Sequence, residues 1–262
     1  MQLLTRIAEQ SSRRPRIPSP TDLPPHVTTP PPNFEPSASD VAVGNCECAT
    51  PGLNYLKIEY GILFFALPAL FASRVVEVPF FALLISAAVV TGALLLRDPA
   101  FDRRQLWNAT GWRRGILGVL GLWSLGVAVL AGIVLLLMPQ DFLRFPRERT
   151  GLWALVMVAY PILSVYPQNI IYRAFVFHRY RAVFRTPEAM LWASAVAFSF
   201  GHVIFHNWVA LTLTLAGGLI FARTYQKHRS LALAATEHAL YGQAIFTIGL
   251  GWYLVHRLAQ SS

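Results

Sequence analysis

Eight polar residues that could carry chemistry interrupt long apolar stretches of this 262-residue chain. They are Gln168, Asn169 and Arg173; His202 and His206; and Glu237, His238 and Gln243. Polar side chains within apolar segments are costly to bury and therefore indicate functional sites. Imidazole and carboxyl groups transfer protons, and amides and imidazoles donate hydrogen bonds to developing negative charge. These residue types favour proton-transfer chemistry.

Three of these residues fall at a similar depth when counted from the ends of their apolar runs. At a rise of about 1.5 Å per helical residue, Asn169 lies about 15 Å deep, His202 about 20 Å and His238 about 12 Å. All three therefore fall within a layer roughly 8 Å thick. A lone histidine at such a position is more often a structural core residue. Several polar residues at one depth favour a common site, with Gln168 and Arg173 close by.

The elements that would carry this site are transmembrane helices. The chain is 55% hydrophobic and only 13% charged, against roughly 25% charged in soluble domains. The apolar runs lack the alternation of membrane-spanning strands. We expect an all-α, polytopic transmembrane bundle of about seven helices, with spans at about 58–73, 78–96, 115–138, 151–178, 189–206, 208–223 and 231–255.

The chain divides into three regions by composition. Residues 1–54 hold ten of the 18 prolines and no apolar run, so we expect a disordered, Pro-rich tail without a cleaved signal segment. Residues 55–150 would form the N-terminal transmembrane helices, and residues 151–256 the core that carries the polar site. Cys46 and Cys48 are best read as an incidental pair in the tail.

The distribution of basic residues predicts the orientation. With seven alternating spans, eleven basic residues in three loops share one side and five face the other. The eleven are Arg97, Arg103, Arg104, Arg113, Arg114, Arg179, Arg181, Arg185, Arg223, Lys227 and Arg229; the five are Arg74, Arg144, Arg147, Arg149 and Arg257. Cytoplasmic loops collect Lys and Arg, so the amino terminus should be cytoplasmic.

The net charge of +9 is explained by these loops. The basic residues lie between apolar runs and form no continuous patch, which argues against a nucleic-acid partner. The expected environment is the lipid bilayer of the cell's inner (plasma) membrane, with a membrane-associated peptide or protein as substrate or partner.

The ordered polar residues resemble the CAAX protease and bacteriocin-processing family of membrane proteins, which includes the type II CAAX prenyl endopeptidases. The motifs of that family read Glu-Glu-x-x-x-Arg, Phe-x-x-x-His and, on a later helix, His-x-x-x-Asn. Arg173 matches the end of the first motif, and His238 matches the start of the third. Phe198 and His202 match the second motif fully. The similarity covers roughly residues 150–255.

The resemblance implies an intramembrane endopeptidase in which a glutamate and a histidine activate water while the later His and Asn stabilise the oxyanion. This chain departs from the pattern in two motifs. Gln168 and Asn169 stand at the two glutamates, and Gly242 stands at the asparagine. Amides have no useful pKa and cannot act as bases. His202 could itself serve as the base, with His238 or Gln243 as the donor. Glu237 adjoins His238, but neighbouring helical residues point about 100° apart.

Two further roles are considered, a metal site and a role for Arg173. His202 and His206 are four residues apart, and with His238 they could bind zinc, although no acidic ligand is near. We therefore expect no cofactor, with zinc as the less favoured alternative. Arg173 is included in the site and is expected to pair with helix ends or polar neighbours, with direct catalysis as the less favoured alternative.

Two hypotheses for function remain open. The first, which we favour, is an intramembrane endopeptidase of the CAAX type with a degenerate glutamate motif. The second is a catalytically silent relative that binds a membrane peptide, lipid or partner protein in the same cavity. A small transporter is less favoured, because no broken helices are repeated across two halves of the chain.

Overall fold

The structure is a computed structural model that describes residues 52–75 and 79–251. Within these residues the chain is helical throughout, without strands. Six helical stretches are long and apolar enough to cross a membrane: Leu53–Ala72, Phe80–Arg97, Arg103–Leu137, Thr150–Arg179, Pro187–Phe205 and Trp208–His228. The predicted all-α transmembrane fold is thereby confirmed.

The helical segments follow one another with short connections. They are α2 (Leu53–Gly61), η2 (Ile62–Ala66), α3 (Leu67–Ala72), α4 (Phe80–Arg97), η3 (Arg103–Leu106), α5 (Ala109–Leu137), η4 (Pro139–Asp141), α6 (Arg144–Glu148), α7 (Thr150–Tyr160), η5 (Pro161–Val165), α8 (Tyr166–Asn169), η6 (Ile170–Phe175), α9 (Val176–Arg179), α10 (Pro187–Phe200), η7 (Val203–Phe205), α11 (Trp208–His228) and α12 (Leu231–Ile248).

Two ends of the sequence-based assignment differ from these bounds. The predicted tail ran to residue 54, but α2 already begins at Leu53; residues 1–51 lie outside the described part. The seventh predicted span corresponds to α12, an 18-residue helix. It carries Glu237, His238 and Gln243, and it is not among the six stretches apolar enough to cross a membrane by length and composition.

Side-chain caps start the helices that carry the site. The Thr186 side chain accepts a hydrogen bond from the backbone N–H of Ala189 at the start of α10. Ser230 does the same for Leu233 at the start of α12. Such caps satisfy amide donors that have no partner within the helix. They fix where each helix begins and therefore the depth at which its polar residues lie along the helix.

The fourth span is one continuous helix that widens twice. Two π-helical segments, η5 and η6, flank the short α8, which carries Gln168 and Asn169. The first begins at Pro161, which has no N–H to donate and so disturbs the regular hydrogen-bond ladder. Such π segments are frequent at functional sites. Here they bracket Gln168 and Asn169, and the second segment carries Arg173.

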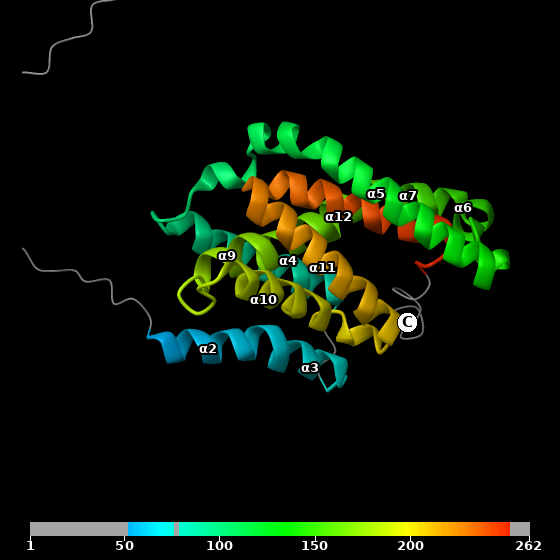
Figure 1. Ribbon diagram of the computed structural model, residues 1–262. Helices are drawn as coiled ribbons and strands as arrows, with labels where there is room; N and C mark the ends of the chain where they lie inside the picture. Colours follow the sequence, from blue (N-terminus) through cyan, green and yellow to red (C-terminus); the bar gives the residue numbers. More distant parts are fainter. Residues whose placement is uncertain (1–51, 76–78, 252–262) are drawn as a thin grey trace, which may run out of the picture. The chain divides into compact units, whose positions relative to one another are not determined.

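Helix α12 lies among the helices that complete the site. It packs against α5 and α11 and also contacts α6, α7, η5 and α8. Figure 1 shows α12 running beside α5, with α11 next to it. Helices α10 and α11 form a closely packed hairpin joined by η7, and η2 packs on α10. The exterior is apolar: Leu117, Leu125 and Val158 are each more than 60% exposed, as expected for lipid-facing residues.

Candidate functional site

Asn169 and His238, from α8 and α12, are in direct contact. The Asn169 side chain is fully buried and His238 is 5% exposed. Asn169 Nδ2 donates to the carbonyl oxygen of Val165 at 2.8 Å and lies 3.1 Å from His238 Nδ1. A carbonyl oxygen can only accept, which fixes Nδ2 as the amide nitrogen. The amide therefore donates its second hydrogen to His238 Nδ1.

This donation determines the protonation of His238. In a neutral imidazole one nitrogen accepts and the other donates. Because Nδ1 accepts from Asn169, Nε2 carries the hydrogen, and it lies 3.2 Å from the hydroxyl oxygen of Tyr160 on α7. His238 thus donates to Tyr160. The imidazole also stacks on Phe221 with ring centroids 4.7 Å apart, which fixes its plane.

His202 carries its hydrogen on the other nitrogen. It follows the end of α10, and its Nδ1 lies 2.7 Å from the carbonyl oxygen of Phe198. That oxygen accepts only, so Nδ1 donates and Nε2 keeps a free lone pair. His202 is partly exposed and lies within electrostatic range of both His238 and Arg173. Of the two site histidines, His202 is the one able to take up a proton through Nε2.

Arg173 and Glu237 add opposite charges to this layer. The fully buried Arg173 guanidinium lies 4.2 Å above the Phe198 ring centroid and 5.5 Å from that of Phe221. Its nitrogens have no hydrogen-bond partner within the described residues. Glu237 is 1% exposed, accepts a hydrogen bond from Thr224 and interacts electrostatically with Arg173. Because the Arg173 guanidinium stacks on aromatic faces and makes no hydrogen bond within the described residues, its N–H donors stay available.

Gln168 lies next to this cluster but is bonded elsewhere. It is 5% exposed, and its Nε2 donates to Ser164 Oγ at 2.7 Å. The acceptor oxygens of Gln168 and Asn169 have no partner within the described residues. Both amides thus stand at the site with unused acceptors. The catalytic roles proposed from the sequence for His202, His238, Asn169, Gln168 and Arg173 stay predictions.

Two other polar residues point away. Gln243, one of two alternatives for a donor, gives its Nε2 hydrogen to the Met157 carbonyl at 2.8 Å. His206 Nε2 lies 2.9 Å from the carbonyl oxygen of Ala72. Because α10 ends at Phe200, His202 and His206 do not share a helical face. Among the described residues no three His, Cys, Asp or Glu side chains lie close enough to hold a metal ion. The zinc alternative therefore has no suitable ligand set there.

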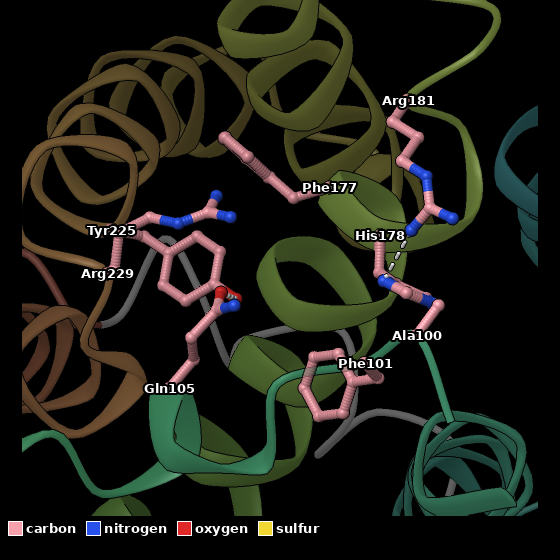
Figure 2. Close-up of a pocket in the computed structure, with 8 residues that line it drawn as sticks. All are labelled: Ala100, Phe101, Gln105, Phe177, His178, Arg181, Tyr225 and Arg229. Atoms are coloured by element: carbon pink, nitrogen blue, oxygen red, sulfur yellow. Dashed lines mark hydrogen bonds between the residues drawn. The ribbon is translucent and has the colours of Figure 1, made fainter. Parts of the chain in front are cut away.

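A separate polar pocket lies where the basic loops meet. It is lined by Ala100, Phe101, Gln105, Phe177, His178, Arg181, Tyr225 and Arg229. Figure 2 shows Arg181 directed at His178, to whose Nδ1 it donates at 3.0 Å. Across the pocket, the Tyr225 hydroxyl donates to Gln105 at 3.0 Å. None of the five predicted site residues lines it.

One family model matches the part of the chain that holds the cluster. Residues 149–244 match the model for Rce1-like type II CAAX prenyl endopeptidases. This part of the chain is therefore similar to that family. The match confirms the family resemblance inferred from the three motifs, all of which begin within it. No curated protein and no solved structure matches the chain.

The matched segment contains two further residues beside the cluster, Tyr160 and Glu237. Tyr160 belongs to no motif and is brought to His238 only by the packing of α7 on α12. Glu237 points about 100° away from His238 on the same helix, and it interacts electrostatically with Arg173. The one sequence signal for Tyr160 is indirect: the glycine at 242 leaves a space that another side chain must fill.

Proposed function

We propose that this protein is an intramembrane endopeptidase that hydrolyses peptide bonds of a membrane-associated protein or peptide, with His202 as the general base. The observation that carries the proposal is the hydrogen bond from His202 Nδ1 to the Phe198 carbonyl. It holds the ring in the tautomer whose Nε2 accepts a proton. The Rce1-like match and the membrane-spanning helices support the reaction class.

The reaction can be written with these groups. His202 Nε2 takes a proton from water as the oxygen attacks the substrate carbonyl carbon, giving a tetrahedral oxyanion. The C–N bond then breaks, and the proton on His202 passes to the departing amine. A carboxylic acid and an amine are released, so one water is consumed for each bond cleaved. A positioned general base typically contributes about 10²–10⁴-fold to such a step.

The other residues would stabilise charge. Arg173 is a buried cation with unused donors, and it lies within electrostatic range of His202. A nearby positive charge stabilises an oxyanion strongly where water is excluded. Asn169 holds His238 in one tautomer, which makes it a positioning residue. Neither amide at 168 and 169 can replace a carboxylate as base.

A silent binding relative is favoured by one specific observation. Where the family has its glutamates, the amide hydrogens of Gln168 and Asn169 are committed to Ser164, Val165 and His238. That arrangement resembles a structural network more than a water-activating site. Under this alternative the polar layer binds a membrane peptide, lipid or partner protein without turnover.

Replacing His202 separates these possibilities. Purified protein in lipid vesicles would be given a membrane-embedded reporter peptide, and cleavage followed by mass spectrometry. We expect His202→Ala to lower kcat by about 10²–10⁴-fold because the proton acceptor is removed. His206→Ala is the matched control, since that imidazole contacts Ala72 outside the cluster; it should retain near-native kcat.

Two outcomes would contradict the proposal. Equal cleavage by the native protein and the His202→Ala variant would remove His202 as base. Binding of the peptide without cleavage by the native protein, with its fold intact, would favour the silent relative.

A further inference from the structure

Gly242 is the point at which the segment similar to Rce1-like endopeptidases departs from the third family motif, His-x-x-x-Asn. It lies in the middle of α12, four residues after His238, and is buried. A Cβ atom placed on Gly242 would overlap the hydroxyl oxygen and ring carbons of Tyr160. The space into which a side chain at 242 would extend is therefore occupied by Tyr160.

Tyr160 is fixed in that space from two sides. Its ring packs edge-on against Phe246 with centroids 5.3 Å apart. Its hydroxyl oxygen lies 3.2 Å from His238 Nε2 and accepts the hydrogen of that nitrogen. Within the described residues, His238 is the only hydrogen-bond partner of the hydroxyl. The Tyr160 O–H hydrogen is thus left to donate.

We propose that Tyr160 takes the place of the asparagine in the third motif and that its hydroxyl is the donor to the reaction's oxyanion. The placement rests on the packing of Gly242. The donor role also rests on the proposed peptidase function. Gly242 is then required for its lack of a side chain, because any larger residue would displace Tyr160.

The hydrogen bonds of the cluster are ordered for this role. Asn169 donates to His238 Nδ1, and His238 Nε2 donates to Tyr160. Each donor in such a chain polarises the next, which makes the terminal O–H a better donor. His238 cannot give the same Nε2 hydrogen fully to a substrate while it is bound to Tyr160. Gln243, the other residue considered as donor, is bonded to Met157.

A double-mutant cycle, measured by thermal stability and called the stability cycle below, tests whether Tyr160 occupies the space of the asparagine in the third motif. In detergent, Gly242→Asn alone should lower Tm by about 4–8 °C through overpacking. In the Tyr160→Ala background, the same Gly242→Asn change should leave Tm unchanged or raise it, because the asparagine then enters vacated space. A similar Tm loss in both backgrounds would overturn the placement.

The matched control separates crowding from the general effect of adding a side chain to a helix. Gly118 on α5 is exposed, and a Cβ there would meet no atom within 4 Å. Gly118→Ala should leave Tm unchanged or slightly raised, since Ala favours helix more than Gly. Gly242→Ala should lower it. Equal responses of the two glycines would also contradict the placement.

Cleavage kinetics test the donor role. Tyr160→Phe removes only the hydroxyl and should lower kcat by about 10²–10³-fold while KM stays near native, as for loss of an oxyanion donor. Tyr160→Ala with Gly242→Asn should recover part of that loss. An active native protein whose kcat survives Tyr160→Phe would overturn the donor role alone. A native protein without cleavage would remove the proposed function and the donor role, while the stability cycle would still decide the placement.

Discussion

The two site histidines differ in which nitrogen holds the hydrogen. His202 gives its Nδ1 hydrogen to the Phe198 carbonyl, whereas His238 receives a hydrogen at Nδ1 from Asn169. One ring is therefore set to accept a proton and the other to donate. His202 is thereby suited to activate water, whereas His238 gives its hydrogen to Tyr160, whose hydroxyl is the proposed donor to the oxyanion. The division of roles follows from two backbone carbonyls, those of Phe198 and Val165, that can only accept.

Restoring the family's glutamates tests whether a carboxylate is needed. If His202 is the base, Gln168→Glu with Asn169→Glu should raise kcat by less than about tenfold, because the base is already present. The change also removes the Asn169 donation to His238 Nδ1. Cleavage of one membrane-embedded peptide by the native and double variants gives the comparison. A gain of about 10²–10⁴-fold would instead assign water activation to a carboxylate.

At this scale the sequence predicted residue types better than hydrogen bonds. Shared depth pointed to Asn169 and His238, which are in direct contact. Shared depth could not identify Tyr160, because no pattern in the sequence around residue 160 indicates which helix packs there. Nor could it exclude Gln243, whose one-residue offset from Gly242 turns it toward Met157. Such orientations depend on helix packing, which a single sequence does not encode in any local pattern.

The close approach of α10 and α11 supports the site at the scale of elements. A Cβ on Gly218 would lie 3.1 Å from the Cα and the carbonyl oxygen of Ala195 and 3.2 Å from the Phe198 ring. Phe198 carries the ring beneath Arg173 and the carbonyl that orients His202. The contact between α10 and α11 thus positions both the ring beneath Arg173 and the carbonyl that orients His202.

We expect Gly218→Ala to destabilise the protein by about 1–2 kcal/mol, because backbone atoms of Ala195 cannot rotate away as a side chain can. Thermal unfolding in detergent measures this. Gly121→Ala on α5 is the control, since a Cβ there meets nothing within 4 Å and the change should be neutral or stabilising. An unchanged Tm for Gly218→Ala would show that the α10–α11 contact accommodates a methyl group without loss of stability, and it would contradict this prediction.

Helices were the predictable part of the fold, and their interruptions were not. Apolar runs in the sequence located the six stretches that are long and apolar enough to cross a membrane, because a helix in the hydrocarbon region must present apolar side chains to lipid. The spacing of His202 and His206 predicted one helical face, but the helix ends at Phe200 and His206 adopts a left-handed backbone conformation with φ 48°. Likewise the π segment η5 begins at Pro161, which cannot donate to the regular ladder, and the apolar pattern of the sequence does not show this change.

At the scale of the described bundle, the basic loops meet at one end. Asp98 after α4 accepts a hydrogen bond from His178 of α9 at 2.7 Å, which holds the pKa of Asp98 below its ordinary value. Asn108 before α5 donates to the carbonyl of His228 at the end of α11. Three loops with eleven basic residues in their vicinity therefore share a face, the pattern typical of a cytoplasmic side.

We predict that this face is cytoplasmic. Single cysteines at Arg104 and Arg147, in a background with Cys46 and Cys48 changed to serine, would be treated with an impermeant thiol reagent on intact cells. The Arg147 position should react from outside, and the Arg104 position only after permeabilisation, because the positive-inside rule places the denser basic loops within. Labelling of the Arg104 position on intact cells would reverse the orientation.

The most direct test of the account is hydrolysis by the native chain itself. Purified protein in vesicles would be mixed with a membrane-embedded peptide in oxygen-18-labelled water, and the products weighed. We predict two fragments with one heavy oxygen in the new terminal carboxyl group, and none above background from the His202→Ala variant. A folded native protein that leaves the peptide intact, or cleavage with heavy oxygen incorporated equally without His202, would contradict the account.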